Sequence, residues 1–437
     1  MVEKAYDGDA LNKMPKTVAP ALDLRCARRR LPIILFGSGQ MRIAGGASGV
    51  LVGLFLADMA NHGATVDAAL VGTLGAVSFA AELVGAMPMG LLSDALAPRT
   101  LMTGGAVLGA TATQLFGMTG LTSIFLLSRT AEGLGAAAGV PPLLAHLTDV
   151  TDGDPPLRAR VMSYFELSLL AGLALGGVLG SQLWRILHTG AFAAVAAVYL
   201  LCSVLLFFGA AGSKSHSRRE AAEGFFRALR EPSLRRLTPA WVCVNSIVGL
   251  WLGPTVTFLM TEKSNGGQFI AGVFADRPDR VGWLLLGYAL VFGAGVTIWS
   301  VVLPRMPIKR ALRISLVAML WVCVGLLAFN HSGTLPVVLR WLIGVATALC
   351  IMVESGFTPA ALALLAGVVG AQAGRGAAMG IYSMLVGVGA IGGSLLAATL
   401  GQWLAVDGLI YGTLAMATIA LMLLNRLHPE EAVHARR

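Results

Sequence analysis

Charged residues are scarce in this chain. Asp, Glu, Lys and Arg make up 13% of its 437 residues, apolar residues make up 56%, and the mean hydropathy is +0.76. Because soluble domains carry about 25% charged residues, this chain has too little polar surface to cover a globule in water. The composition argues against an ordinary cytosolic enzyme and excludes a disordered chain.

The sequence patterns of common catalytic and cofactor sites are also missing. There is no P-loop, no HExxH, no GxSxG and no zinc-binding spacing. The five cysteines form no CxxC pair. His146 has no second histidine at ligand spacing, so we expect it to lie with Asp149, Asp152 and Asp154 in a solvated loop. We predict a protein that is not an enzyme and that holds no metal or cofactor.

Long apolar stretches are abundant instead. A helix of about 20 apolar residues crosses a bilayer, and twelve such stretches predict an all-α membrane protein with twelve transmembrane helices. Prolines inside two of them, Pro141–Pro142 and Pro359, predict kinks. The expected spans are residues 31–58, 69–91, 101–119, 122–147, 161–184, 191–212, 238–261, 281–303, 312–330, 335–365, 377–402 and 408–425.

Basic residues are distributed unevenly among the segments that connect the spans. If both termini are cytoplasmic, 25 Lys and Arg lie in cytoplasmic segments and four lie on the opposite side. Because basic residues gather in cytoplasmic loops, this bias predicts cytoplasmic termini in the cell (inner) membrane. It also accounts for the net charge of +9 without any binding to nucleic acid.

A polar segment divides the spans into two sets of six. We expect a cytoplasmic tail at 1–30, a six-helix bundle at 31–212, a cytoplasmic linker at 213–237, a second six-helix bundle at 238–425 and a cytoplasmic tail at 426–437. The linker is either a short interfacial helix or a basic tether.

The two sets resemble each other. Four residues of the first set recur 217 positions later in the second, and two more recur 211 positions later. Two similar six-helix bundles are typical of transporters whose site lies between them, near the middle of the membrane. The recurring pairs are Arg158 with Arg375, Met162 with Met379, Gly172 with Gly389, Gly176 with Gly393, Arg129 with Arg340, and Gly133 with Gly344.

Three segments resemble motifs of the major facilitator superfamily. The loop after the second span has Gly90, Asp94 and Arg99 at the spacing of that family's signature loop. The fourth span reads SRTAEGLGAAAG from Ser128, and the fifth reads AGLALGGVLG, which is similar to a motif of the antiporter branches but has Leu173 in place of their proline. The resemblance implies the family's fold of two pseudo-symmetric six-helix bundles and secondary transport by alternating access.

The signature loop suggests a gate. Asp94 could pair with Arg158 and Arg160, which lie after the fourth span. Such a pair would hold the cytoplasmic side shut and break on opening, as a two-state latch does. The alternative is an ordinary surface salt bridge worth about 0–1 kcal/mol.

Small residues form stripes on several spans. Gly172 and Gly176 lie four residues apart and so share one face of a helix. Small residues let helix backbones approach closely in lipid, so we expect a packing role for this set. A hinge role during rocking is the alternative. The glycines assigned to helix packing are Gly172, Gly176, Gly177, Gly389 and Gly393.

Charged residues inside the spans give the most direct indication of a site. Each costs about 2.5–3.5 kcal/mol at mid-membrane on insertion scales, so each should face a cavity or a partner. Our candidates for proton coupling are Glu82 first, then Glu132, Glu166 and Asp58. Glu132 lies three residues after Arg129, so a structural ion pair is its alternative role. The candidates for the substrate cavity are Arg42, Arg129, Asn245, Trp251, Arg340 and Glu354.

The resemblance favours proton-coupled export of an amphipathic small molecule. Uptake of an anionic metabolite, held by Arg42, Arg129 or Arg340, is a second possibility, and a non-transporting membrane scaffold or sensor is a third. The expected partners are a small-molecule substrate, protons and the lipid bilayer, and we expect a monomer.

Overall fold

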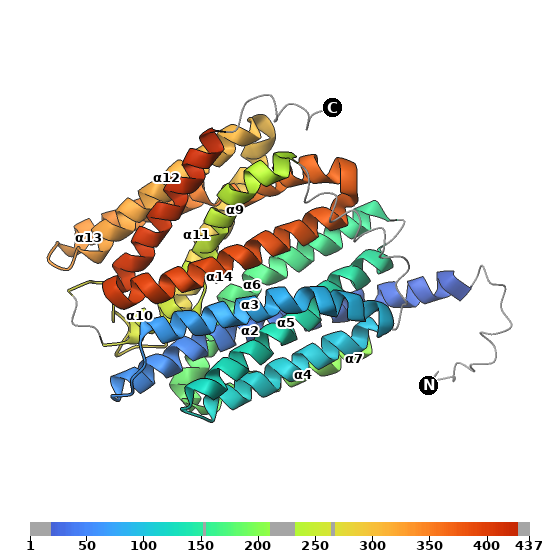
Figure 1. Cartoon of the computed structure of the whole chain (residues 1–437), viewed down its shortest axis with the longest axis horizontal. Helices are drawn as coiled ribbons and strands as arrows, with labels where there is room; N and C mark the ends of the chain where they lie inside the picture. The colour runs from blue at the N-terminus through green and yellow to red at the C-terminus, as the bar shows by residue number, and fades with distance from the viewer. Residues whose placement is uncertain (1–18, 152–153, 210–231, 264–266, 427–437) are drawn as a thin grey trace.

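The computed structural model describes residues 19–151, 154–209, 232–263 and 267–426, and these residues form helices joined by short connections (Figure 1). The elements are α2 Ala19–Asn61, α3 Ala68–Ala95, α4 Pro98–Gly117, α5 Thr122–Val150, α6 Pro155–Leu187, α7 Gly190–Gly209, α9 Pro232–Trp251, α10 Pro254–Thr261, α11 Arg280–Val302, the 3-10 turn η1 Leu303–Arg305, α12 Ile308–Asn330, α13 Val337–Glu354 and α14 Phe357–Asn425. Most of the linker 213–237 lies outside the described residues.

All twelve expected spans lie mainly on helical residues. Within the described parts of the chain, seven helical stretches are long and apolar enough to cross a membrane, and α9 with α10 forms a further one that is bent by 41°. The 69 residues of α14 would be about 100 Å long if straight, far more than one crossing needs. Its chain reverses at Ala405, which has a left-handed φ of 48°. The prediction of an all-helical membrane protein is confirmed.

Proline and acidic residues explain several helix boundaries. Pro359 has no N–H to donate to the carbonyl of residue 355, and the helix is interrupted just before it, because α13 ends at Glu354 and α14 begins at Phe357. The expected kink at Pro359 is therefore a full interruption. In contrast, α5 continues as a helix through Pro141–Pro142. Asp67 caps α3 by accepting a hydrogen bond from the Leu70 amide at 2.9 Å.

The expectation of a solvated loop from His146 to Asp154 is wrong for part of that segment. His146 is buried inside α5, because that helix extends as far as Val150. Asp154 caps α6 by accepting a hydrogen bond from the Leu157 amide, and it also pairs with Arg28 of α2 at 3.4 Å.

The helices pack in two groups that follow the chain order. In the N-terminal group, α2–α7, α2 packs on α6 and α7, α3 on α5, and α4 on α5 and α7. In the C-terminal group, α9–α14, α14 packs on α9 and α12, and α13 on α11 and α12. The groups meet where α3 lies along α14, where α6 lies along α11, and where α10 contacts α2 and α3 (Figure 1).

Glycines set the same close approach in both groups. Gly172 of α6 faces Arg42 of α2, and a Cβ added to this glycine would lie 2.5 Å from the Arg42 Cβ. Gly389 of α14 faces Asn245 of α9 in the same way, also at 2.5 Å between the two Cβ positions. The residues that follow by one turn, Gly176 and Gly393, meet the backbones of α2 and α9. The pair α2–α6 is thus repeated as α9–α14.

The hydrophobic cores differ between the two ends of the molecule. We call the end where α7 stops and α9 starts the linker end, and the end where α2 and α10 stop the far end. At the far end one core combines both groups, with Phe55 and Leu56 of α2 in the same cluster as Phe258 of α10 and Leu409 of α14. At the linker end each group has a core of its own. The two groups are therefore joined at the far end.

Candidate functional site

Four helices of the N-terminal group bring polar side chains together inside the apolar bundle. Arg42 comes from α2, Glu82 from α3, Arg129 and Glu132 from α5, and Tyr199 from α7. We call these five residues the charge cluster. Each is mostly or partly buried, so their electrostatic interactions are weakly screened by water.

Within the charge cluster, Arg129 and Glu132 form an ion pair. The Nη1 atom of Arg129 contacts the Oε2 atom of Glu132, and the two side chains are 8% and 13% exposed. Arg129 also donates from Nε to the Leu74 carbonyl at 3.5 Å, which links α5 to α3. Glu132 thus has a buried cationic partner on its own helix.

Glu82 is the second carboxylate of the cluster and is half-buried. Among the described residues no cation lies within ion-pair distance of it, and the charges that act on it are those of Arg42 and Glu132. The Arg42 guanidinium lies 4.3 Å from the centre of the Phe165 ring of α6, in a cation–π contact. Gly133 lets α5 approach the backbone of Glu82 closely.

Tyr199 was not expected from the sequence. Its side chain is almost fully buried, its hydroxyl lies beside Gly45 of α2, and its ring lies against Gly109 of α4. The charges of Glu132, Arg129 and Glu82 all act on it. One signal was available, because Tyr199 is a single hydroxyl-bearing aromatic residue among the Ala, Val and Leu of its span.

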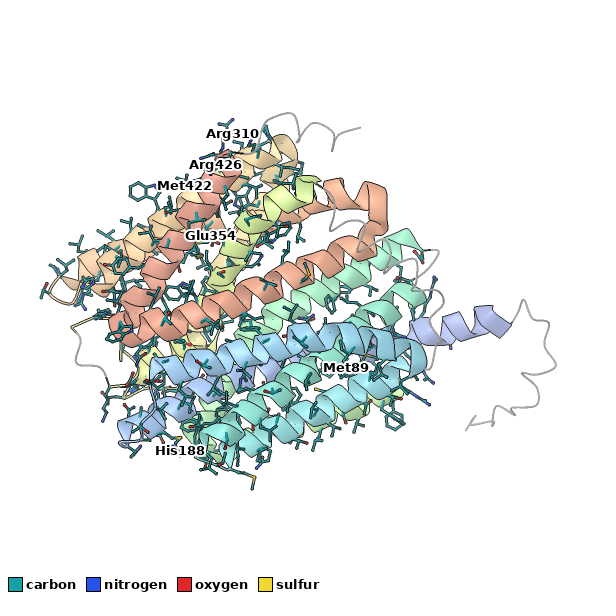
Figure 2. All side chains as sticks on the ribbon, in the orientation of Figure 1. Met89, His188, Arg310, Glu354, Met422 and Arg426 are labelled. Atoms are coloured by element: carbon teal, nitrogen blue, oxygen red, sulfur yellow. The ribbon has the colours of Figure 1, made fainter. Side chains whose placement is uncertain are left out.

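Three predicted site residues of the C-terminal group are Asn245 and Trp251 of α9 and Glu354 of α13. Glu354 is the last residue of α13, beside the break before α14, and its charge acts on Tyr288 of α11 and Cys323 of α12. Trp251 donates from its indole nitrogen to the Thr413 hydroxyl at 2.7 Å, and Asn245 donates to the Trp241 carbonyl at 3.0 Å. Figure 2 shows Glu354 among the helices of this group and away from Met89 of α3.

Several other predicted site residues lie apart from the charge cluster. Asp58 is exposed near the end of α2 and pairs with His62 at 3.5 Å. Arg340 lies near the start of α13 with its guanidinium 5.3 Å from the centre of the Phe269 ring. Arg340 is therefore at the far end and does not meet Arg129, its sequence counterpart.

The predicted gate falls largely outside the described side chains. Arg160 is exposed, and Arg99 is exposed with its guanidinium 5.6 Å from the centre of the Phe207 ring. The side chains of Asp94, Arg158 and Glu166 are outside the described set, as is the surface around Gly90. The latch and the role of Glu166 stay predictions.

Four hydrogen bonds between described residues join the two groups, and all four lie at the far end. Asn61 of α2 makes two of them. Its side-chain nitrogen donates to the Thr261 carbonyl at 3.1 Å, and its oxygen accepts from the Lys263 amide at 2.8 Å. The other two are donated by Gln182 to the Asp279 carbonyl at 3.0 Å and by Gln402 to Asp67 at 3.2 Å.

A carboxyl group lies directly at this junction. Glu262 is the residue between Thr261 and Lys263, both of which Asn61 holds. Burial, and then repulsion by Asp67, raise the pKa of the Glu262 carboxyl above its ordinary value of 4.5. The closed far end thus places two acidic groups from different helix groups near each other.

Comparison with known proteins identifies the family. Residues 41–275, more than half of the chain, match the Major Facilitator Superfamily. The structure is similar to a crystal structure of the nucleoside transporter NupG, with a TM-score of 0.69 at 12% identity over 93% of this chain and 99% of the other. It is also similar to a bacterial homologue of the human lysosomal transporter Spinster in an inward-facing, unoccupied conformation, with a TM-score of 0.65 at 12% identity over 93% and 97% of the two chains. No curated protein matches the sequence. The chain belongs to the Major Facilitator Superfamily, a family of membrane transporters.

Proposed function

We propose that this protein is a secondary active transporter that moves a small molecule by alternating access and couples the movement to protons. One observation supports the proposal above all. Among the described side chains, the bundle that contains the buried charge cluster shares a core with the other bundle at the far end only. Two bundles joined in this way can rock about a central site.

The direction in which the site opens follows from the same contacts. The far end is closed by a common core and by hydrogen bonds at Asn61, Gln182 and Gln402. α6 and α11 touch between Gly177–Gln182 and Asp279–Leu285, which lie at the far end of both helices. If the termini are cytoplasmic, as the charge bias predicts, this arrangement is open towards the cytoplasm, and transport requires these far-end contacts to break.

Glu82 is the residue that we propose as the proton carrier. The charge of Glu132 is balanced by Arg129 on the same helix, whereas Glu82 has no ion pair of its own among the described residues. A change in the protonation of Glu82 therefore alters the net charge of the cluster. The charge of Arg42 attracts the Glu82 carboxylate, and the Arg42 guanidinium also packs on Phe165 of α6. Protonation of Glu82 would therefore alter the contact between α2 and α6.

The proposed substrate is an amphipathic compound, and the proposed direction is export. Spans that are largely apolar, with few polar groups among them, suit a ligand of this kind. A second candidate is the uptake of a small anionic or nucleoside-like metabolite. The Arg42 guanidinium over the Phe165 ring offers a cation and an aromatic face together, and one similar structure is a nucleoside transporter.

Flux measurements in membrane vesicles test both candidates. A fluorescent amphipathic dye should accumulate in everted vesicles when a proton gradient is imposed, and Glu82→Gln should abolish the dependence on the gradient. Asp276→Asn is the control, because it changes an exposed carboxylate of the other group that is not among the candidate site residues. Uptake of a labelled nucleoside by right-side-out vesicles, without dye accumulation, would select the second candidate. Coupling that survives Glu82→Gln would remove Glu82 as the carrier.

A further inference from the structure

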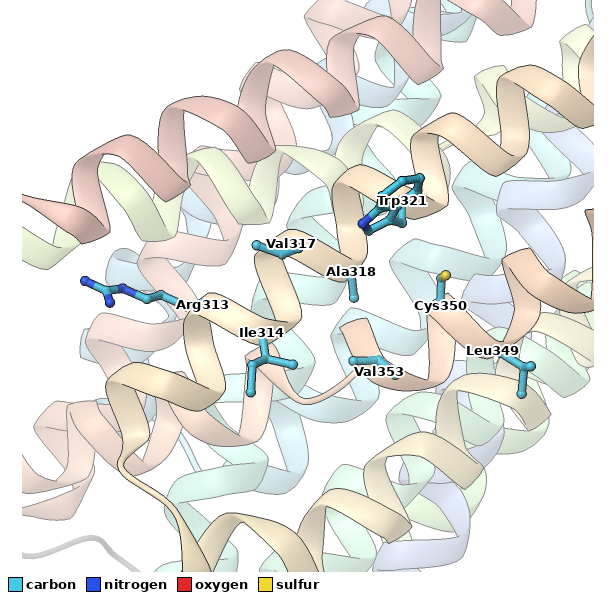
Figure 3. A pocket seen from close by; sticks show the side chains of 8 residues that line it. All are labelled: Arg313, Ile314, Val317, Ala318, Trp321, Leu349, Cys350 and Val353. Atoms are coloured by element: carbon cyan, nitrogen blue, oxygen red, sulfur yellow. The ribbon is translucent and has the colours of Figure 1, made fainter.

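A groove lies between α12 and α13 on the C-terminal group, at a distance from the charge cluster. Its volume is about 480 Å³, within the range of pockets that hold small ligands. Ile314, Val317 and Trp321 of α12 form one wall, and Leu349 and Val353 of α13 form the other (Figure 3). The groove is thus a long apolar slot between two adjacent helices.

The groove opens away from the protein core. The residues along its rim are large and apolar yet exposed, with 61% exposure for Trp321, 58% for Leu349 and 43% for Val317. Both helices belong to stretches that are long and apolar enough to cross a membrane. In a membrane protein such a surface is in contact with lipid chains, so a lipid is the molecule that has direct access to the slot.

One end of the groove is strongly basic. Arg313 lines it there and points along α12 away from Trp321 (Figure 3). Lys309 lies one turn before Arg313 on the same helix face, and the charges of the two residues interact. Arg310, which follows Lys309, and Arg305, which precedes it, are both exposed. Figure 2 shows Arg310 and Arg426 at the same end of the C-terminal group.

We call Arg305, Lys309, Arg310 and Arg313 the basic cluster. Among the described residues, no carboxylate forms an ion pair with its three exposed arginines. Between Asp279 and Asp407 the sequence contains a single acidic residue, Glu354. It follows Val353 at the same end of the groove as Arg313, and its charge acts on Tyr288 and Cys323. Asp279 and Asp407 both lie near the far end. Four positive charges beside an apolar slot therefore complement an anionic head group that carries an apolar tail.

We propose that this groove binds one anionic phospholipid of the surrounding bilayer. The phosphate contacts Arg313 and Lys309, and one acyl chain lies between α12 and α13 as far as Trp321. The eight helical steps from Arg313 to Trp321 span about 12 Å. One leaflet of the hydrocarbon core is about 15 Å thick, so the slot matches the depth that a chain reaches from a head group at Arg313.

Quenching of tryptophan fluorescence by brominated lipid tests the proposal in the full-length protein. The protein is placed in phosphatidylcholine nanodiscs that contain a low mole fraction of phosphatidylglycerol with brominated chains, and brominated phosphatidylcholine at the same fraction is the reference. The difference between the native protein and Trp321→Phe gives the signal of Trp321 alone. We expect Trp321 to be quenched at a much lower fraction of the anionic lipid than of the neutral one.

Charge variants show whether the head group is held where we propose. Lys309→Ala and Arg313→Ala should each weaken the preference for phosphatidylglycerol about fivefold, because one basic residue near a membrane surface contributes about 1 kcal/mol to anionic lipid binding. Arg29→Ala is the matched control, since Arg29 is an exposed arginine on α2 of the other group. Melting temperatures of the three variants should match that of the native protein and so show that they are folded.

Three results would overturn the proposal. Equal quenching of Trp321 by both brominated lipids would mean that the groove holds any neighbouring lipid. A preference that survives Lys309→Ala and Arg313→Ala would mean that the basic cluster does not select the head group. Relief of the quenching by water-soluble glycerol phosphate would assign the cluster to a soluble anion.

Discussion

The N-terminal and C-terminal groups share a packing scheme but differ in their chemistry. In both, glycines of one long helix contact the first helix of the group, as Gly172 does with Arg42 and Gly389 does with Asn245. The N-terminal group places two arginines, two carboxylates and a tyrosine together in its interior. In the C-terminal group, Glu354 is the one acidic residue of α11–α13, and the basic residues of α12 lie near its start. The two groups therefore share the same close helix contacts, but their ionisable side chains differ in number and position.

Of the substitutions that test this difference between the groups, we expect Arg129→Met to reduce the stability of the protein most. Replacing Arg129 with methionine leaves the Glu132 carboxylate buried without its cation. Removal of one partner from a buried ion pair costs about 3–5 kcal/mol. The apparent melting temperature of the purified Arg129→Met protein in detergent should fall far below that of the native protein.

Two controls show whether this cost comes from the unpaired charge. The double substitution Arg129→Met with Glu132→Leu removes both charges and should recover most of the loss, because an apolar pair of similar size often replaces a buried ion pair without cost. Arg340→Met changes the counterpart in the C-terminal group, where the guanidinium lies over the Phe269 ring and, among the described residues, no carboxylate pairs with it. A loss at Arg340 as large as at Arg129 would contradict the contrast between the groups.

A smaller effect is expected from the glycines that both groups share. Gly46 and Gly249 occupy matching places on α2 and α9, and a Cβ at Gly46 would lie 2.5 Å from the Gly172 carbonyl oxygen. At Gly249 an added Cβ would overlap the Ala390 carbonyl and lie 2.6 Å from the Ser394 amide nitrogen. Gly46→Ala and Gly249→Ala should each destabilise the protein by about 1–3 kcal/mol, as overpacking does.

Gly49 is the matched control for these two substitutions. It lies one turn after Gly46 on α2, and nothing lies within 4 Å of an added Cβ. Gly49→Ala should raise the stability by up to about 1 kcal/mol, because alanine favours a helix more than glycine does. Unfolding of all three variants under the same conditions checks the ranking. If the close helix contact is important for stability in one group only, Gly46→Ala and Gly249→Ala will lose unequal amounts of stability.

The sequence was sufficient to predict the helices, because each span carries its own signal. A stretch of about 20 apolar residues has few alternatives to a transmembrane helix. The reversal at Ala405 inside α14 was also predicted, since the expected spans 377–402 and 408–425 leave residues 403–407 between them. The exact ends were less predictable. α5 includes His146 because local apolar packing there outweighs the nearby acidic residues.

The candidate site was predictable only in part, because contacts between spans leave no pattern in a single sequence. Arg129 and Glu132 lie on one helix at a spacing of three, so their ion pair was among the alternatives from the start. Tyr199 and Phe165 come from other helices, and their positions beside the cluster depend on how α7 and α6 pack. The lipid-facing groove combines residues of α12 and α13 for the same reason.

A pH-dependent effect is expected where the two groups meet. The pKa of Glu262 is raised in the folded protein, by burial and by Asp67, so the protonated form is favoured there. Below pH 4.5, the ordinary pKa of this carboxyl, Glu262 is mostly protonated in both the folded and the unfolded protein, so it does not lower the free energy of unfolding. As the pH rises above 4.5, keeping the carboxyl in place becomes unfavourable, and the far-end contact weakens.

Glu262→Gln should remove this dependence. Melting curves from acidic to neutral pH should show that the native protein loses more stability than the variant as the pH rises. Asp276→Asn changes an exposed acid of the same far-end segment and should leave the pH profile unchanged. If the native and Glu262→Gln profiles run parallel, the repulsion between Asp67 and Glu262 does not contribute to the junction.

The smallest effect should come from cations at the linker end, where the groups again differ. Arg28 of the N-terminal group pairs with Asp154, but both side chains are more than a third exposed, so Arg28→Ala should cost at most about 1 kcal/mol and less at high salt. Arg310 of the C-terminal group lies in a basic cluster with few acidic neighbours, so Arg310→Ala should relieve repulsion and leave the melting temperature unchanged or slightly higher in neutral detergent. When phosphatidylglycerol is added, Arg310→Ala should become the more destabilising of the two substitutions, because the anionic lipid then binds the basic cluster. If Arg310→Ala destabilises the lipid-free protein more than Arg28→Ala does, then the protein itself balances the basic cluster, and no anionic lipid is needed to do so.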